Sequence, residues 1–213
     1  MMFKTIILDF DGTIVESVGI KDAAFKALFG NFPEHLDEIM SYHLFNNATI
    51  RFEKFEHIYR NILRLPYTPE IRQWLSKEFS RLVFEKIITC PFVPGAVDFL
   101  EYFQKITGLY LISVSPEKEL NNILTARNLT RYFKKVYSFE WKKPDAISDI
   151  LQLEGISPEY AIFMGDTYED SCSAKKSNVF FIGRDSGKPF ENINFPIFKD
   201  LVEIKKYLMD AMR

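Results

Sequence analysis

Six polar side chains that could do chemistry stand near short apolar runs in this 213-residue chain. In chain order they are Asp9, Asp11, Ser113, Lys143, Asp166 and Asp170. Carboxylates gathered in one place repel one another unless a cation lies among them, and an all-oxygen ligand set suits Mg²⁺. A hydroxyl donor and a lysine ammonium would offset the charge on the oxygens of a phosphoryl group. Together these residue types indicate magnesium-dependent phosphoryl transfer.

The apolar runs predict the scaffold that brings these distant residues together. Thr5–Phe10 is rich in Ile and Leu, lacks polar alternation and leads into Asp-Gly, which is typical of a strand buried on both faces. Similar runs are Leu109–Val114, Ala161–Met164 and Val179–Ile182, with a weaker one at Val136–Phe139. Helical patterns between the runs predict a doubly wound, Rossmann-like α/β domain with a parallel sheet. Ligands bind such a sheet at the carboxyl ends of its strands.

The chain from about residue 17 to residue 90 breaks this alternation. It contains no convincing strand, and its apolar residues recur at helical spacing. We therefore predict an all-helical domain, residues 17–90, inserted into an α/β core made of residues 1–16 and 91–213. The insert would follow the first strand directly.

The composition is that of an ordinary soluble globular protein, with 47% hydrophobic and 26% charged residues. Acidic and basic residues are mixed and the formal net charge is -2, so neither a nucleic-acid partner nor a membrane surface is implied. The apolar start is too short and too acidic for a signal peptide, and we expect a cytoplasmic protein. Cys90 and Cys172 stand far apart, which indicates neither a disulfide framework nor a zinc cluster. The oligomeric state has no signal in the sequence.

The order and spacing of the motifs resemble those of the haloacid dehalogenase superfamily of phosphohydrolases, in its phosphoglycolate-phosphatase-like branch. The resemblance covers almost the whole chain. It is carried by Asp9-Phe10-Asp11-Gly12-Thr13, Ser113, Lys143-Pro144 and Gly165-Asp166 with Asp170, and more loosely by Val93-Pro94-Gly95. It implies a helical cap on an α/β core, a small phosphorylated metabolite as substrate and Mg²⁺ as cofactor.

The resemblance also implies a role for each acidic residue. Asp9 would attack phosphorus and form an aspartyl-phosphate, and Asp11 would act as general acid and base. Asp9, Asp166 and the backbone carbonyl of Asp11 would bind the metal. Asp170 would support the metal or orient Lys143.

The implied substrate contacts come from a serine and several basic residues. Ser113 would hydrogen-bond a phosphoryl oxygen, and Lys143 would offset the charge of the phosphate and the nucleophile. The adjacent Lys142 leaves the register of the catalytic lysine open, although the proline after Lys143 favours the latter. Arg51 and Lys54 resemble a basic pair in the cap of relatives, so we expect both to bind the substrate.

Other interpretations are compatible with the same residues. A phosphomutase of the β-phosphoglucomutase type would form the same phosphoaspartate and return the phosphoryl group to a bound sugar. A non-catalytic binding protein could share the fold, although none of the catalytic motif residues is lost. Phosphoglycolate, a sugar phosphate and a nucleoside monophosphate all remain possible substrates. We interpret His35, His43 and His57 as surface or partly buried side chains, not metal ligands.

Overall fold

The computed structural model describes residues 3–46, 49–191 and 194–212. The chain forms two compact units. The first, here called the core unit, consists of Met1–Glu16 and Cys90–Arg213, and the second, the helical unit, of Ser17–Thr89. None of the helices formed by the described residues combines the length and the apolarity that a membrane crossing requires.

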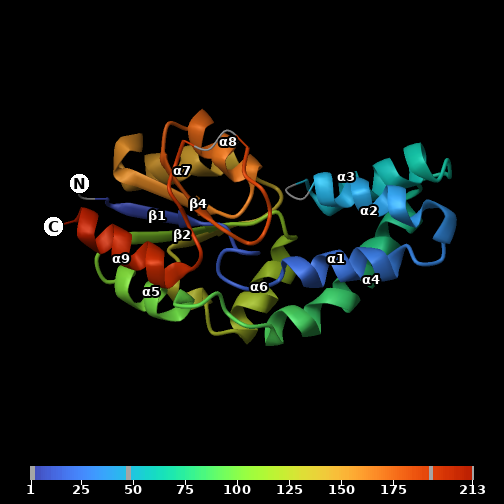
Figure 1. Ribbon diagram of the computed structural model, residues 1–213, viewed down its shortest axis with the longest axis horizontal. Helices are drawn as coiled ribbons and strands as arrows, with labels where there is room; N and C mark the ends of the chain where they lie inside the picture. Colours follow the sequence, from blue (N-terminus) through green and yellow to red (C-terminus); the bar gives the residue numbers. More distant parts are fainter. Residues whose placement is uncertain (1–2, 47–48, 192–193, 213) are drawn as a thin grey trace. The chain divides into compact units, whose positions relative to one another are not determined.

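Among the described residues, the sheet of the core unit has six parallel strands in the order β3-β2-β1-β4-β5-β6 (Figure 1). They are β1 (Thr5–Leu8), β2 (Gly108–Ile112), β3 (Lys135–Tyr137), β4 (Ala161–Gly165), β5 (Phe180–Arg184) and β6 (Ile197–Phe198). The predicted α/β fold with a parallel sheet is therefore confirmed. The sequence pattern missed β6, because a two-residue strand with half-buried side chains forms no apolar run.

Helices cover both faces of this sheet. The core unit contains α5 (Ala96–Phe103), α6 (Glu117–Ala126), α7 (Lys143–Glu154), α8 (Tyr168–Lys176) and α9 (Leu201–Ala211). In Figure 1, α5 and α9 lie on one side of the sheet and α7 and α8 on the other. Every residue of β1, β2 and β4 is consequently buried. Burial on both faces explains why these strands are continuous apolar runs without polar alternation.

The strand order reverses between β1 and β4. The chain runs from β1 outwards through β2 to β3, then returns past β1 to β4 and continues in the opposite direction. The register pairs Leu8 of β1 with Leu111 on one side and Met164 on the other. A switch of this kind opens a crevice at the carboxyl ends of the strands. The segments that follow β1 and β4 therefore emerge as neighbours at this edge.

The helical unit contains α1 (Val18–Leu28), α2 (Leu36–Phe45), α3 (Arg51–His57) and α4 (Pro69–Thr89). One turn of π-helix, Ile58–Ile62, continues α3. The interior of the helical unit is built from aromatic rings. The ring centre of Phe25 lies 5.6 Å from that of Phe55 and 5.0 Å from that of Phe79. Such rings are large apolar side chains that prefer offset or edge contacts.

Candidate active site

Three carboxylates meet at the switch point of the sheet. Asp9 follows β1, Asp166 follows β4, and Asp170 lies in the first turn of α8. Each side chain offers an oxygen within 4.8 Å of the other two, and all three residues are buried. The backbone N–H of Asp9 donates to the carbonyl of Met164 at 2.8 Å, which continues the β1–β4 ladder by one bond. The sheet order thus brings together residues that are 157 to 161 positions apart in the sequence, from Asp9 to Asp166 and to Asp170.

The ammonium group of Lys143 lies against this cluster. Lys143 is the first residue of α7, and its Nζ donates to Oδ1 of Asp9 at 2.8 Å and also to Oδ1 of Asp170. The side chain of Lys143 is only 10% exposed. Lys142, by contrast, is exposed. Of the two lysines that the sequence left open, the fold directs Lys143 to the carboxylates.

Asp170 is held by the start of its own helix. Its Oδ2 accepts from the backbone N–H of Thr167 at 3.1 Å and from the Thr167 hydroxyl at 2.6 Å, which completes a capping box. A Cβ atom on Gly165 would lie 2.5 Å from Cγ of Asp170, so only glycine fits there. With Oδ2 bound to Thr167 and Oδ1 to Lys143, Asp170 orients the lysine ammonium.

The electrostatics of the cluster follow from burial and crowding. Burial raises the pKa of Asp9 well above its ordinary value; Lys143 opposes this shift, and the neighbouring Asp170 and Asp166 add to it. Burial, with the charge of Asp170, raises the pKa of Asp166 from 3.8 to about 7. Burial alone lowers the pKa of Lys143, but Asp170 and Asp9 together raise it above its ordinary value. Among the described residues, the charges of Lys143 and, at Asp166, of Lys188 oppose three carboxylates, a charge balance that still favours an additional cation.

The residues present fit a divalent metal ion. Oδ2 of Asp166 is buried and makes no hydrogen bond to any described residue. A buried carboxylate oxygen without a donor costs free energy unless a cation coordinates it. The donors of the cluster are all carboxylate oxygens, which suit Mg²⁺ better than a softer metal.

Two further predicted site residues lie at the same edge of the sheet. Asp11 is half-buried, two residues after Asp9, and its carboxylate is not one of the three that form the cluster. Ser113 follows β2, the strand beside β1; it is buried, and its Oγ accepts from the backbone N–H of Ser115 at 3.1 Å. The direct metal and phosphoryl contacts expected of Asp11 and Ser113 stay predictions.

The comparison with protein families identifies the family of this chain. The chain matches the haloacid dehalogenase-like hydrolase family over residues 6–184, which is most of its length. The chain is a haloacid dehalogenase-like hydrolase. The family membership predicted from the motifs is thereby confirmed.

Individual relatives of this hydrolase are distant. Phosphoglycolate phosphatase 1 of Pseudomonas aeruginosa is 25% identical over 185 residues, which cover 83% of this chain and 67% of that protein. A predicted phosphoglycolate phosphatase from Haemophilus somnus 129pt is 17% identical and superposes with a TM-score of 0.76, covering 98% of this chain and 99% of that one. The HAD-hydrolase YfnB from Bacillus subtilis, bound to magnesium, is 16% identical with a TM-score of 0.76, covering 98% and 100%. At these identities the solved structures show a shared fold.

The two predicted basic residues of the helical unit lie on one face of α3. Arg51 and Lys54 are 8% and 3% exposed and share that face with the buried Phe55. The guanidinium of Arg51 lies 5.2 Å from the ring centre of Phe79. The sequence predicts that Arg51 and Lys54 bind the substrate, but it does not predict that both side chains are buried.

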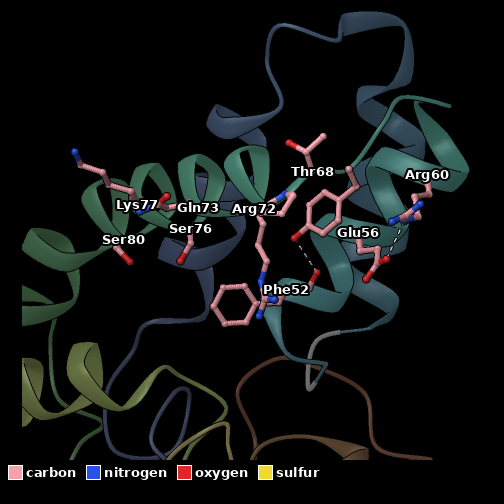
Figure 2. A pocket seen from close by; sticks show the side chains of 11 residues that line it. Phe52, Glu56, Arg60, Thr68, Arg72, Gln73, Ser76, Lys77 and Ser80 are labelled. Atoms are coloured by element: carbon pink, nitrogen blue, oxygen red, sulfur yellow. Dashed lines mark hydrogen bonds and ion pairs between the residues drawn. The ribbon is translucent and has the colours of Figure 1, made fainter.

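The opposite side of α3 borders a groove of about 840 Å³ (Figure 2). Two pairs of lining residues are hydrogen-bonded to each other: Arg60 donates to Glu56 at 2.8 Å, and the Tyr67 hydroxyl donates to the carbonyl of Phe52 at 3.4 Å. The guanidinium of Arg72 stacks 4.7 Å above the ring of Phe52. None of the site residues predicted from the sequence lines this groove. We therefore do not place the chemistry of the hydrolase there.

Sequence reasoning missed an arginine that braces the segment after Asp11. Arg184, the last residue of β5, is 6% exposed and donates to the carbonyl of Gly12 at 3.0 Å. The same guanidinium forms two hydrogen bonds to the carboxylate of Glu16. Bidentate pairing of this kind fixes both partners in orientation. No local pattern marks Arg184, because Gly12 and Glu16 stand 168 to 172 positions earlier in the chain.

Proposed function

We propose that this hydrolase releases inorganic phosphate from a small phosphomonoester, using Mg²⁺ and a covalent aspartyl-phosphate on Asp9. The observation that carries the proposal is the cluster at the switch point, where Lys143 contacts Asp9 beside the two carboxylates of Asp166 and Asp170. A buried nucleophile, a fixed positive charge and an incompletely satisfied oxygen set suit a phosphoryl group better than any uncharged substrate.

The proposed reaction has two steps on the same aspartate. An oxygen of Asp9 forms a bond to phosphorus while the ester P–O bond breaks, and Asp11 supplies a proton to the leaving oxygen. Asp11 then removes a proton from water, which attacks phosphorus and releases phosphate and free Asp9. Lys143 holds Asp9 in place and offsets charge on the phosphoryl oxygens, as does the Ser113 hydroxyl. Mg²⁺, bound by the cluster carboxylates and the Asp11 carbonyl, would supply further positive charge.

We further propose that the helical unit is a cap that selects the substrate. Its buried cations, Arg51 and Lys54, would bind the part of the substrate beyond its phosphoryl group. A small phosphorylated carboxylate is the favoured class, because the P. aeruginosa relative is a phosphoglycolate phosphatase and two cations suit a second anionic group. The relative bound to magnesium supports the choice of metal.

A panel of phosphomonoesters tests the proposal. We expect release of inorganic phosphate from phosphoglycolate, and more slowly from a generic aryl phosphate, with Mg²⁺ present and none in EDTA. Sugar phosphates in the panel should yield free phosphate and no isomerised sugar phosphate. Isomerised product would identify a phosphomutase, and phosphate release that continues unchanged in EDTA would contradict the mechanism.

Asp166 predicts how the stability of the metal-free protein depends on pH. The pKa of its carboxyl is about 7 in the folded state, against 3.8 as its ordinary value. The folded state therefore holds this proton more tightly than the unfolded state does. The stabilisation that the proton gives the folded state is fully present below pH 3.8 and is lost as pH rises through about 7. In EDTA we expect Asp166→Asn to have a higher Tm than wild type, with a gain that increases from about pH 5 to about pH 8.

Differential scanning calorimetry with and without Mg²⁺ checks this expectation. Mg²⁺ should raise the Tm of the wild type and have a much smaller effect on Asp166→Asn. Asp98→Asn, an exposed carboxylate in α5, is the matched control and should follow the wild type. Equal stabilisation of wild type and Asp166→Asn by Mg²⁺ would place the metal elsewhere.

A further inference from the structure

Three polar side chains from three helices of the helical unit form a chain of contacts, of which His43 and Lys54 are buried and Asp22 is half-buried. Asp22 comes from α1, His43 from α2 and Lys54 from α3. Nε2 of His43 lies 2.9 Å from Oδ1 of Asp22, and Nδ1 of His43 lies 3.3 Å from Nζ of Lys54. His43 and Lys54 are each 3% exposed. The interpretation of His43 as a surface or partly buried side chain is therefore wrong, because helix packing turns it inward.

The chemistry of the partners favours one tautomer of His43. A lysine ammonium has only donors, and an ionised carboxylate has only acceptors. Only the neutral imidazole with its proton on Nε2 can donate to Asp22 and accept from Lys54 at the same time. The carboxylate of Asp22 thus selects the tautomer that offers Nδ1 to the ammonium.

Aromatic packing holds the imidazole and the ammonium in place. The ring of Phe25 stacks on the ring of His43, with centroids 3.8 Å apart and planes 20° from parallel. The Nζ of Lys54 also lies 5.5 Å from the centre of Phe25 and 3.4 Å from the carbonyl of His43. A lysine side chain normally samples many rotamers, whereas contacts with His43 and Phe25 hold the ammonium of Lys54 in place.

A structural role alone is a poor explanation for this arrangement. Taking the ammonium of Lys54 out of water is costly, and apolar residues of the same volume often stabilise a core as well as or better than buried charged groups. The surrounding interior of the helical unit is already aromatic. A buried lysine with a dedicated acceptor is better explained by a requirement for a cation at a defined position.

We propose that the Asp22–His43 pair positions Lys54 for substrate binding, which makes His43 a positioning residue for the specificity of the hydrolase. This inference rests on the proposed function, in which Lys54 binds the part of the substrate beyond the phosphoryl group. His43 does not contact the substrate; it acts by accepting a hydrogen bond from Lys54. Its contribution therefore depends entirely on Lys54 being present.

A double-mutant cycle measured with phosphoglycolate tests the proposal. His43→Phe keeps an aromatic ring against Phe25 but removes the acceptor, and Lys54→Met removes the ammonium. We expect His43→Phe to raise KM about tenfold, as is typical for loss of a hydrogen bond to a charged group, with kcat changed less than about twofold. In the Lys54→Met background, His43→Phe should cause no further rise in KM.

Supporting variants separate the alternatives. Asp22→Asn should raise KM in the same direction as His43→Phe, while His35→Gln, in the same unit, should leave both kinetic constants unchanged. Equal rises in KM caused by His43→Phe with and without Lys54 would overturn the positioning role and leave the proposed function intact. A normal KM in Lys54→Met would overturn both the inference and the assignment of Lys54. Absence of turnover in the wild type would instead contradict the proposed function itself.

Discussion

Asp9→Asn should abolish release of phosphate, with kcat at least about a thousandfold below that of the wild type. The amide has the size of the carboxylate, so the side chain can still occupy the site beside Lys143, but its neutral oxygen is a far weaker nucleophile than a carboxylate. Phosphate release from phosphoglycolate or an aryl phosphate in the presence of Mg²⁺ measures the effect. Mass spectrometry of rapidly quenched wild-type protein should show a phosphoryl adduct that the variant lacks.

Two controls make the Asp9 result specific. Asp98→Asn carries the same chemical change on a side chain that is 73% exposed, and it should retain full activity. Circular dichroism should show that Asp9→Asn is folded. If Asp9→Asn kept full activity, or if the adduct mapped to a peptide without residue 9, the proposed nucleophile would be wrong.

Lys143→Met is the second change for which we expect a large loss, about 10²–10³-fold in kcat. The substitution removes the ammonium that contacts both Asp9 and Asp170, so the negative charge on the phosphoryl oxygens and the nucleophile is no longer offset by this side chain. The loss should appear mainly in kcat, because the charge on the reacting group is greatest at the transition state. Steady-state kinetics with saturating Mg²⁺ are the appropriate measurement.

The neighbouring lysine is a closely matched control. Lys142→Met deletes the same charge one residue earlier, from a side chain that is exposed to solvent. We expect its kinetic constants to remain within about twofold of wild type, as for most surface substitutions. A large loss in Lys142→Met together with normal activity in Lys143→Met would show that Lys142, and not Lys143, is the catalytic lysine.

Much of the fold could be predicted because burial on both faces leaves a visible mark on the strands. The apolar runs at Thr5–Phe10 and Ala161–Met164 correspond to β1 and β4, although the structure ends β1 at Leu8. The two last residues of the predicted run, Asp9 and Phe10, lie beyond the assigned strand, although the N–H of Asp9 still donates to the carbonyl of Met164. Apolar patterning alone therefore does not fix the last residue of a strand.

The residues that surround the predicted site were less accessible to sequence reasoning. Arg184 and His43 belong to no motif, and each has its nearest partners more than 10 positions away along the chain. Both side chains are commonly solvated, so their types favoured an exposed position. Their burial depends on which elements pack together, and local spacing contains no information on that packing.

The sequence by itself determined that this chain has an α/β core with a parallel sheet, and that Asp9 belongs with the other acidic motifs. Strand burial and motif order are local properties, so they can be detected without coordinates. Only the tertiary structure decided that Lys143 and not Lys142 reaches Asp9, and that Asp170 orients this lysine. The physical reason is that the strand order and the start of α7 set side-chain direction, and a shift of one residue turns a lysine from the carboxylates to solvent.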